Sequence, residues 1–243
     1  MSSDPSTRPV FQAPFGVATP SDDRLAADLR GFGPLGILAI VVILFTGNVF
    51  AGQVVVPIGA VGVLLWVRLS RTPWREIGYV RPANWIAAVA IGVAFGVAFK
   101  LLMKAIVMPL LGAGPINWAF HYWAGNRAVL PAAIWACLVA GFAEETIFRG
   151  YLFERLGKLF RPGVGAKIAI VLITSLLFGL AHYLVQGLAG TEQATIVGLV
   201  FGSIFAFTGS NFMLMFVHAA FDLTALAIIY WNLETRVAHL VFR

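Results

Sequence analysis

The stretch AEETIFRGYL, residues 143–152, places two neighbouring carboxylates and an arginine directly after a long apolar run. The preceding residues, LPAAIWACLVAGF at 130–142, carry no charge. An ionised side chain deep in a bilayer costs roughly 2.5–3.5 kcal/mol even on a mild insertion scale. Acidic residues in such a setting therefore need either a charge partner or a function.

The whole chain has the composition of a membrane protein. Of its 243 residues, 60% are hydrophobic and 12% are charged, whereas soluble domains are nearer half apolar and a quarter charged. Apolar runs of about 20 residues recur along it, and the backbone groups of a spanning segment must be satisfied internally. We therefore predict an all-α fold, a polytopic transmembrane helical bundle with about seven spans, in a range of roughly six to eight. The predicted spans are 34–51, 54–70, 85–111, 130–157, 166–186, 194–208 and 211–231.

Two regions differ in character along the chain. Residues 1–33 are polar and contain prolines, without the short apolar core and cleavage site of a signal peptide, so they are predicted to be a soluble N-terminal tail. Residues 34–243 are predicted to form one membrane domain. Cys137 is the single cysteine and lies in an apolar run, so no intrachain disulfide is expected.

Basic residues are distributed unevenly between the two predicted sides of the bilayer. The tail, the connection at 68–81 and the connection at 149–167 carry most of them, and all three lie on the same side. By the positive-inside rule this side, with the N-terminus, is predicted to be cytoplasmic. The net charge of +6 then reflects topology, and binding to nucleic acid is not expected.

A few ionisable residues remain within the predicted spans, and such residues are functional candidates by default. Glu144 lies 18 residues before the connection at Pro162 and His182 lies 20 after it, which at about 1.5 Å per residue gives both a similar depth. His218 and Asp222 lie roughly 10–17 Å into the last span by the same rise. Four ionisable groups from three helices are thus expected in one layer.

Helical spacing assigns these groups to faces, because residues four apart share a face and neighbours are about 100° apart. Glu145 and Arg149 are expected to form an ion pair and to support the structure. Glu144 then faces a cavity together with the histidines. Phe178 shares its face with His182, and His218 shares its face with Asp222. Lys100 and Lys104 lie one turn apart in the third span. We expect their side chains either to extend towards the membrane surface or to face a cavity rim.

One carboxylate and two imidazoles in a shielded pocket suit the activation of water. Glu144 would act as general base, and the histidines would position the water or donate to a developing oxyanion. The same groups could instead bind zinc through Glu144, His182 and His218, with Asp222 as a fourth ligand. Either site would carry out hydrolysis, with a peptide bond as the expected target.

Other designs of intramembrane protease fit the sequence less well. An aspartyl dyad needs two membrane aspartates, and Asp222 alone qualifies. The HExxH zinc motif is absent from the sequence. Ser175 and Ser203 are flanked by small apolar residues, as in ordinary helix packing.

Three motifs occur in a characteristic order. EETIFR at 144–149 fits EExxxR, FGLAH at 178–182 fits FxxxH, and HAAFD at 218–222 fits a final Hxxx(N or D) pattern. Together they resemble the CPBP family of CAAX proteases and bacteriocin-processing enzymes, also called the Abi family. The resemblance covers about 130–230 and implies a helical intramembrane endopeptidase with its catalytic core there. It implies that Glu144 and His182 activate water. Because this mechanism needs no metal, the resemblance favours a metal-free site.

The resemblance also implies that His218 and Asp222 stabilise the oxyanion. CAAX proteases usually carry an asparagine at the last position, and an ionised carboxylate cannot donate as an amide does. Asp222 would therefore be protonated, paired with a charged His218, or a metal ligand.

The expected substrate is a membrane-associated protein, either of the prenylated CAAX type or with another lipid anchor. One alternative is a non-catalytic immunity or scaffold protein of the same fold. A second alternative is a proton-coupled transporter using Glu144 and His182 as a relay, although the sequence lacks the paired repeats that would support it. The sequence does not define an oligomeric state.

Overall fold

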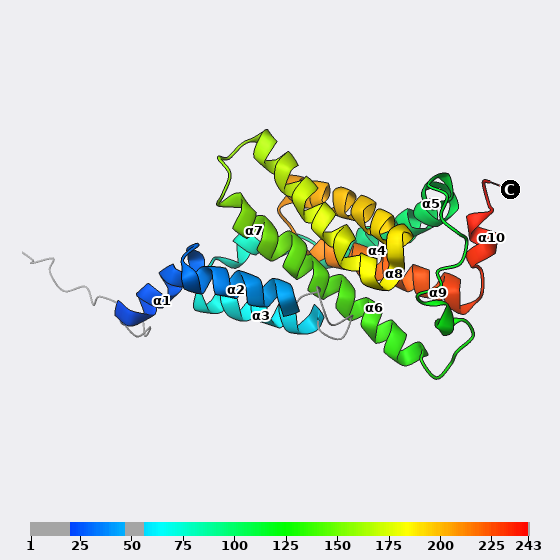
Figure 1. Ribbon diagram of the computed structural model, residues 1–243, viewed down its shortest axis with the longest axis horizontal. Helices are drawn as coiled ribbons and strands as arrows, with labels where there is room; N and C mark the ends of the chain where they lie inside the picture. Colours follow the sequence, from blue (N-terminus) through cyan, green and yellow to red (C-terminus); the bar gives the residue numbers. More distant parts are fainter. Residues whose placement is uncertain (1–19, 47–55, 243) are drawn as a thin grey trace, which may run out of the picture.

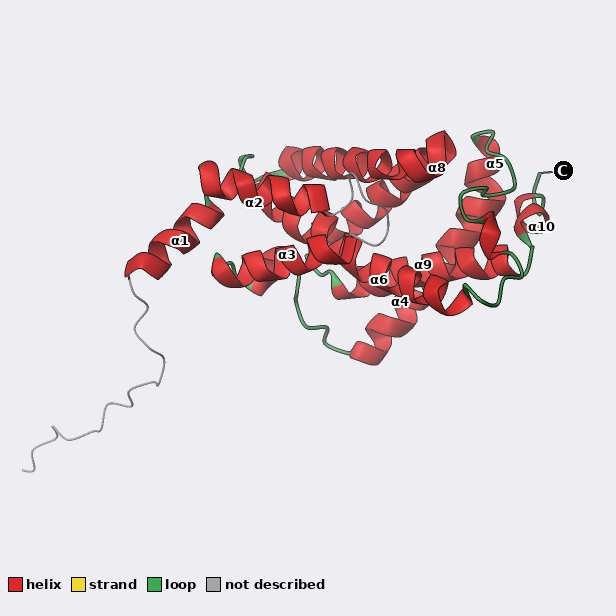
Figure 2. Cartoon of the chain, turned by 60° about the horizontal axis from the view of Figure 1, so that its bottom comes forward, coloured by secondary structure: helices red, strands yellow, loops and turns green. Residues whose placement is uncertain are grey.

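The computed structural model describes residues 20–46 and 56–242, and these residues form helices joined by loops, with no strand among them (Figure 2). The predicted all-α class is therefore confirmed for this part of the chain. The α-helices are α1 (Pro20–Arg30), α2 (Pro34–Leu44), α3 (Val56–Leu69), α4 (Trp85–Leu102), α5 (Met108–Leu110), α6 (Leu130–Glu145), α7 (Leu152–Gly157), α8 (Val164–Thr208), α9 (Phe212–Tyr230) and α10 (Glu234–Ala238). Short 3₁₀ segments η2 (Trp74–Ile77) and η4 (His121–Trp123), and π segments η3 (Met103–Val107) and η5 (Thr146–Tyr151), complete them.

The predicted count of about seven spans is not confirmed. Within the described residues, four helical stretches are long and apolar enough to cross a membrane, or five if the bent pair Arg24–Arg30 and Pro34–Leu44 is one span. Helices α2 and α3 have 11 and 14 residues, whereas a hydrocarbon core of about 30 Å needs about 20. Parts of the first two predicted spans, at 47–51 and 54–55, lie outside the described residues. The four stretches are Trp85–Leu110, Leu130–Gly157, Val164–Thr208 and Phe212–Tyr230.

The 45-residue element α8 contains a reversal of chain direction at Gly187, whose φ of 62° and ψ of −158° are not helical. Beyond it the second arm packs back along the first (Figure 1): Lys167 Nζ donates to the carbonyl of Ala206 at 2.8 Å, and a Cβ on Gly198 would lie 2.9 Å from Ser175 Cα. The predicted spans 166–186 and 194–208 correspond to these two arms. Glycine suits the turn because it adopts positive φ without a Cβ penalty.

Helix α9 packs between α4 and α6, and glycines allow the close approach on both sides. A Cβ on Gly96 would lie 2.2 Å from the carbonyl oxygen of Val217, and one on Gly141 would lie 2.6 Å from Ala219 N. Small residues are what let membrane helices approach at backbone distance. The register of α9, which carries the last of the three motifs, is therefore set by contacts that involve backbone on both sides.

Helix α6 ends directly after Glu144 and Glu145. Residues Thr146–Tyr151 form a π segment, and all of them are buried. Such segments are rare and occur often at functional sites. The helix continues as α7, so the widened turn lies within the stretch that was predicted as one span at 130–157.

Replacing Gly96 by alanine should destabilise the bundle, because the new methyl group would clash with the backbone of α9. Overpacking of this kind typically costs about 1–3 kcal/mol. Thermal unfolding of the detergent-solubilised protein should show a lower midpoint. Gly165→Ala is the matched control, since nothing lies within 4 Å of a Cβ there. Equal midpoints for the two variants would contradict the packing described.

Candidate active site

A small cavity of about 80 Å³ brings the predicted catalytic residues together. Glu144 from the end of α6, His182 from the first arm of α8, and His218 and Asp222 from α9 all line it, with Phe178 beside them. Three helices thus bring these side chains to one cavity, as the spacing arguments predict. The roles of these residues in catalysis remain predictions.

His218 is the centre of the polar contacts. Its Nδ1 lies 2.8 Å from Glu145 Oε1 and donates to it, while its Nε2 lies 3.6 Å from Glu144 Oε2 and 3.7 Å from Asp222 Oδ2. Its side chain is only 5% exposed. One imidazole therefore contacts three carboxylates, with one ring nitrogen held by Glu145 and the other between Glu144 and Asp222.

The ion pair expected from the four-residue spacing is present. Arg149 Nη1 donates to Glu145 Oε1 at 2.9 Å, and both side chains are fully or almost fully buried. The guanidinium also lies over the ring of Phe178 at 4.7 Å and that of Phe201 at 5.6 Å. A buried cation of this kind is stabilised by one carboxylate and two aromatic faces.

The contact between Glu145 and His218 was missed by the sequence analysis, which gave Glu145 a purely structural role. The same oxygen, Oε1, accepts from both Arg149 and His218. Glu145 therefore orients an imidazole of the cavity as well as neutralising the arginine. The sequence carries no signal for this contact, because it depends on how α6 is rotated against α9.

His182 is oriented by its own helix. Its Nδ1 donates to the carbonyl of Phe178 at 2.8 Å, and the Phe178 ring packs against the imidazole with centroids 4.7 Å apart. With Nδ1 protonated, Nε2 of the neutral ring is an acceptor. The four-residue spacing of the FxxxH motif thus supplies both the hydrogen bond and the packing that fix this histidine.

Asn211 is a further residue of the site region that the sequence analysis did not single out. It is completely buried at the start of α9, and its Nδ2 donates to the backbone carbonyl of Glu145 at 3.0 Å. Its backbone N–H donates to Gly78 O at 2.8 Å. Asn211 thereby joins the helix of the glutamates, the loop before α4 and the helix of His218.

The choice between a metal-free site and the zinc alternative stays a prediction. Across residues 20–46 and 56–242, no group of three or more His, Cys, Asp or Glu side chains could hold a metal ion. Within the predicted ligand set, His218 donates from Nδ1 to Glu145, and its Nε2 lies 3.6 Å from Glu144.

Comparison with known families matches residues 126–224 to the family described as Type II CAAX prenyl endopeptidase Rce1-like. The matched segment contains all three motifs and the whole polar cluster, so the predicted resemblance to the CAAX proteases is confirmed over it. Comparison with curated proteins and with solved structures found no match. The apolar helices and this family together identify the chain as an integral membrane protein.

Glu145→Gln and Arg149→Gln should each lower the stability strongly, because each strands a buried charge, at a cost of roughly 3–5 kcal/mol when the pair is truly buried. The double variant should recover part of the melting temperature, since no unpaired partner remains. Its turnover should nevertheless stay low, because His218 has lost the carboxylate that orients it.

Melting curves and turnover measured on the wild type and these three variants separate the two roles of Glu145. Recovery of turnover in parallel with stability in the double variant would show that Glu145 has no positioning role.

Proposed function

We propose that this chain is an intramembrane endopeptidase that hydrolyses a peptide bond in a membrane-anchored protein of the prenylated CAAX type. The observation that carries the proposal is the convergence of Glu144, His182 and His218 on one cavity inside a helical bundle. The match of residues 126–224 to the CAAX prenyl endopeptidases supports the substrate class. A scaffold or immunity protein would gain nothing from buried ionisable groups gathered around a cavity.

The proposed reaction begins with a water molecule between Glu144 and His182. Glu144 removes a proton from the water while His182 Nε2 accepts its second hydrogen bond, and the water oxygen attacks the scissile carbonyl carbon. The electron pair of the carbonyl moves to oxygen and forms an oxyanion. Collapse of this intermediate breaks the C–N bond, and Glu144 returns its proton to the leaving nitrogen.

The oxyanion is stabilised, in this proposal, by a proton that His218 and Asp222 hold between them. The two groups lie 3.7 Å apart, and the hydrogen bond from His218 Nδ1 to Glu145 fixes the ring. The proton can reside on His218 Nε2 or on the Asp222 carboxyl, and in either place it can be donated. This arrangement would let aspartate serve where the family usually has an amide.

Glu144→Gln should abolish turnover while the solubilised protein stays monodisperse with a nearly unchanged melting temperature. The substitution removes the base but keeps the shape of the side chain, and general bases typically contribute about 10²- to 10⁴-fold. The measurement is cleavage of a farnesylated CAAX peptide. Comparison of membrane proteomes containing the wild type or this variant would identify native substrates by their new termini. Undiminished cleavage by Glu144→Gln would refute the mechanism.

Asp222→Asn should keep most of the activity, because the amide supplies a permanent donor at the same position. Asp222→Ala should lose about 10²- to 10³-fold, as expected when one oxyanion donor is removed. Wild-type activity should fall at high pH as the shared proton is lost, and this fall should be weaker in the asparagine variant. An asparagine variant as inactive as the alanine variant would exclude the shared-proton role.

Turnover should need no metal, because the proposed base and donors are side chains of the chain itself. Purified active protein should contain well under one zinc per chain and should keep its activity after treatment with a strong chelator. Stoichiometric zinc that is lost together with activity, and that restores activity when added back, would overturn this proposal.

A further inference from the structure

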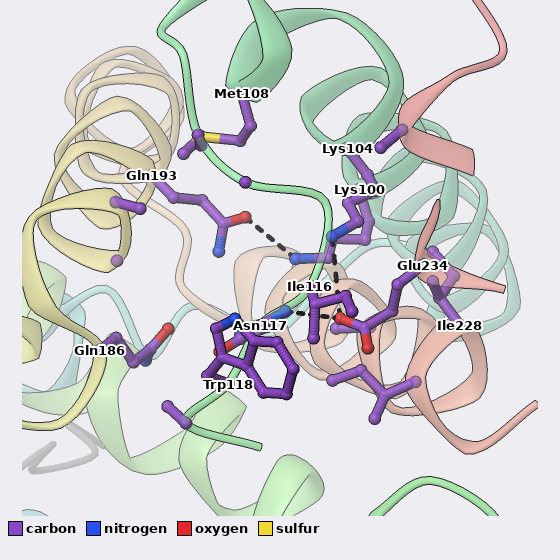
Figure 3. Close-up of a pocket in the computed structure, with 18 of the residues that line it drawn as sticks. Lys100, Lys104, Met108, Ile116, Asn117, Trp118, Gln186, Gln193, Ile228 and Glu234 are labelled. Carbon is purple, nitrogen blue, oxygen red and sulfur yellow. Dashed lines mark hydrogen bonds and ion pairs between the residues drawn. The ribbon is translucent and has the colours of Figure 1, made fainter. Parts of the chain in front are cut away.

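A larger cavity of about 400 Å³ lies beside the small one. Both cavities are lined by Lys100, Asn117, Gln186 and Gln193, so they adjoin along these polar side chains (Figure 3). The volume lies in the range of about 300–1,000 Å³ that is usual for ligand pockets. A ligand in the large cavity would therefore reach directly towards Glu144 and His218.

Lys100 is the notable group at this junction. It is only 6% exposed, its Nζ donates to Gln193 Oε1 at 3.1 Å, and the same atom lies 4.6 Å from the ring centroid of Phe221. An ammonium has three donors, and here one amide oxygen and one aromatic face serve it. Among the described residues, no carboxylate forms an ion pair with it within 4.0 Å.

The acidic neighbours of Lys100 are engaged elsewhere. Asp222 lies against His218, and Glu234 accepts from Asn117 N at 2.8 Å and from His121 Nδ1 at 2.9 Å. A buried charge that lacks a counter-charge is costly. The junction of the two cavities therefore presents a cation whose natural partner is an anion supplied by a ligand.

Lys104 provides the contrast within the same cavity. It lies one helical turn further along, and its Nζ is 3.8 Å from Glu234 Oε1 (Figure 3). The same atom donates to the carbonyl of Pro115. Its charge is therefore balanced within the protein. Both lysines were expected to snorkel or to face a cavity rim. Among the described residues, Lys104 is paired with a carboxylate and Lys100 is not.

Glu234 also holds one wall of the large cavity together. Through its contacts with Asn117, His121 and Lys104, it connects the loop before α6 and the short helix α10 to η3, the segment directly after α4. Residues of that loop and of α10 line the cavity. This wall of the cavity is therefore held in place by contacts between separate segments of the chain.

We propose that Lys100, assisted by Gln193, binds the C-terminal carboxylate of the peptide substrate in the large cavity. The inference rests on the proposed endopeptidase function and adds a specificity-determining residue to it. With the chain end held at Lys100, the scissile bond is positioned at a set distance upstream, next to Glu144 and His218. The site is thereby selective for bonds close to a free carboxyl terminus.

The test uses three farnesylated CAAX peptides of the same length. The first has a free terminal carboxylate, the second has a terminal amide, and the third has a terminal amide with glutamate as its last residue, so that its only added carboxylate is on a side chain. The proteins are the wild type, Lys100→Met, Gln193→Glu and the matched control Lys104→Gln. Gln193→Glu would place a resident carboxylate against Lys100 with almost no change in volume.

The measured quantity is the ratio of kcat/KM for the free acid to that for the amide, which cancels differences in the amount of folded protein. The wild type should prefer the free acid on the order of 10- to 100-fold, the range for one charge-assisted hydrogen bond. The ratio should fall towards one in Lys100→Met and in Gln193→Glu, and should persist in Lys104→Gln.

The possible failures can be told apart. Cleavage without preference in the wild type, or a preference that survives Lys100→Met, would overturn the carboxylate site and leave the endopeptidase intact. Equal cleavage of the glutamate peptide and the free acid would show that the site reads a side chain and not the chain end. If no peptide is cleaved, the endopeptidase function fails. Binding of the free acid and the amide to the wild type then decides the carboxylate site, and equal affinities would overturn it.

Discussion

One carboxylate oxygen, Glu145 Oε1, holds the centre of this membrane protein together. It accepts from Arg149 on its own helix and from His218 on α9, and all three side chains are shielded from solvent. In such surroundings each charge is tolerable only while its partner stays in place. The orientation of the imidazole, the seating of the arginine and the contact between α6 and α9 therefore depend on each other.

Backbone packing protects this arrangement. Helix α9 approaches α4 through Gly96 and α6 through Gly141, at distances that leave no room for a Cβ. Buried Asn211 adds hydrogen bonds from the start of α9 to the backbone of Glu145 and of Gly78. Rigid backbone contacts suit a site whose groups must keep their separations to within a fraction of an ångström.

Features of the site that depend on the spacing of residues within one helix could be predicted from the sequence. Four-residue spacing yielded the pair of Glu145 with Arg149, and residue counting yielded the common depth of Glu144, His182 and His218. Contacts between helices could not be predicted from the sequence, because packing sets how each helix is rotated about its axis. For that reason two features became visible only in three dimensions: the bond from Glu145 to His218, and the lack of a carboxylate within ion-pair distance of Lys100 among the described residues. The predicted number of spans is not confirmed among the described residues, where α2 and α3 are apolar but have only 11 and 14 residues.

The reversal of α8 at Gly187 has a geometric consequence for the cavities. His182 lies five residues before that glycine and Gln193 lies six after it, so the two side chains belong to opposite arms of one covalent hairpin. The cavity wall that carries His182 and the wall that carries Gln193 are thus two arms of one continuous segment, which reverses at Gly187. In the proposed peptide complex, the length of this hairpin tip would set the distance between the scissile bond beside His182 and the chain end beside Gln193.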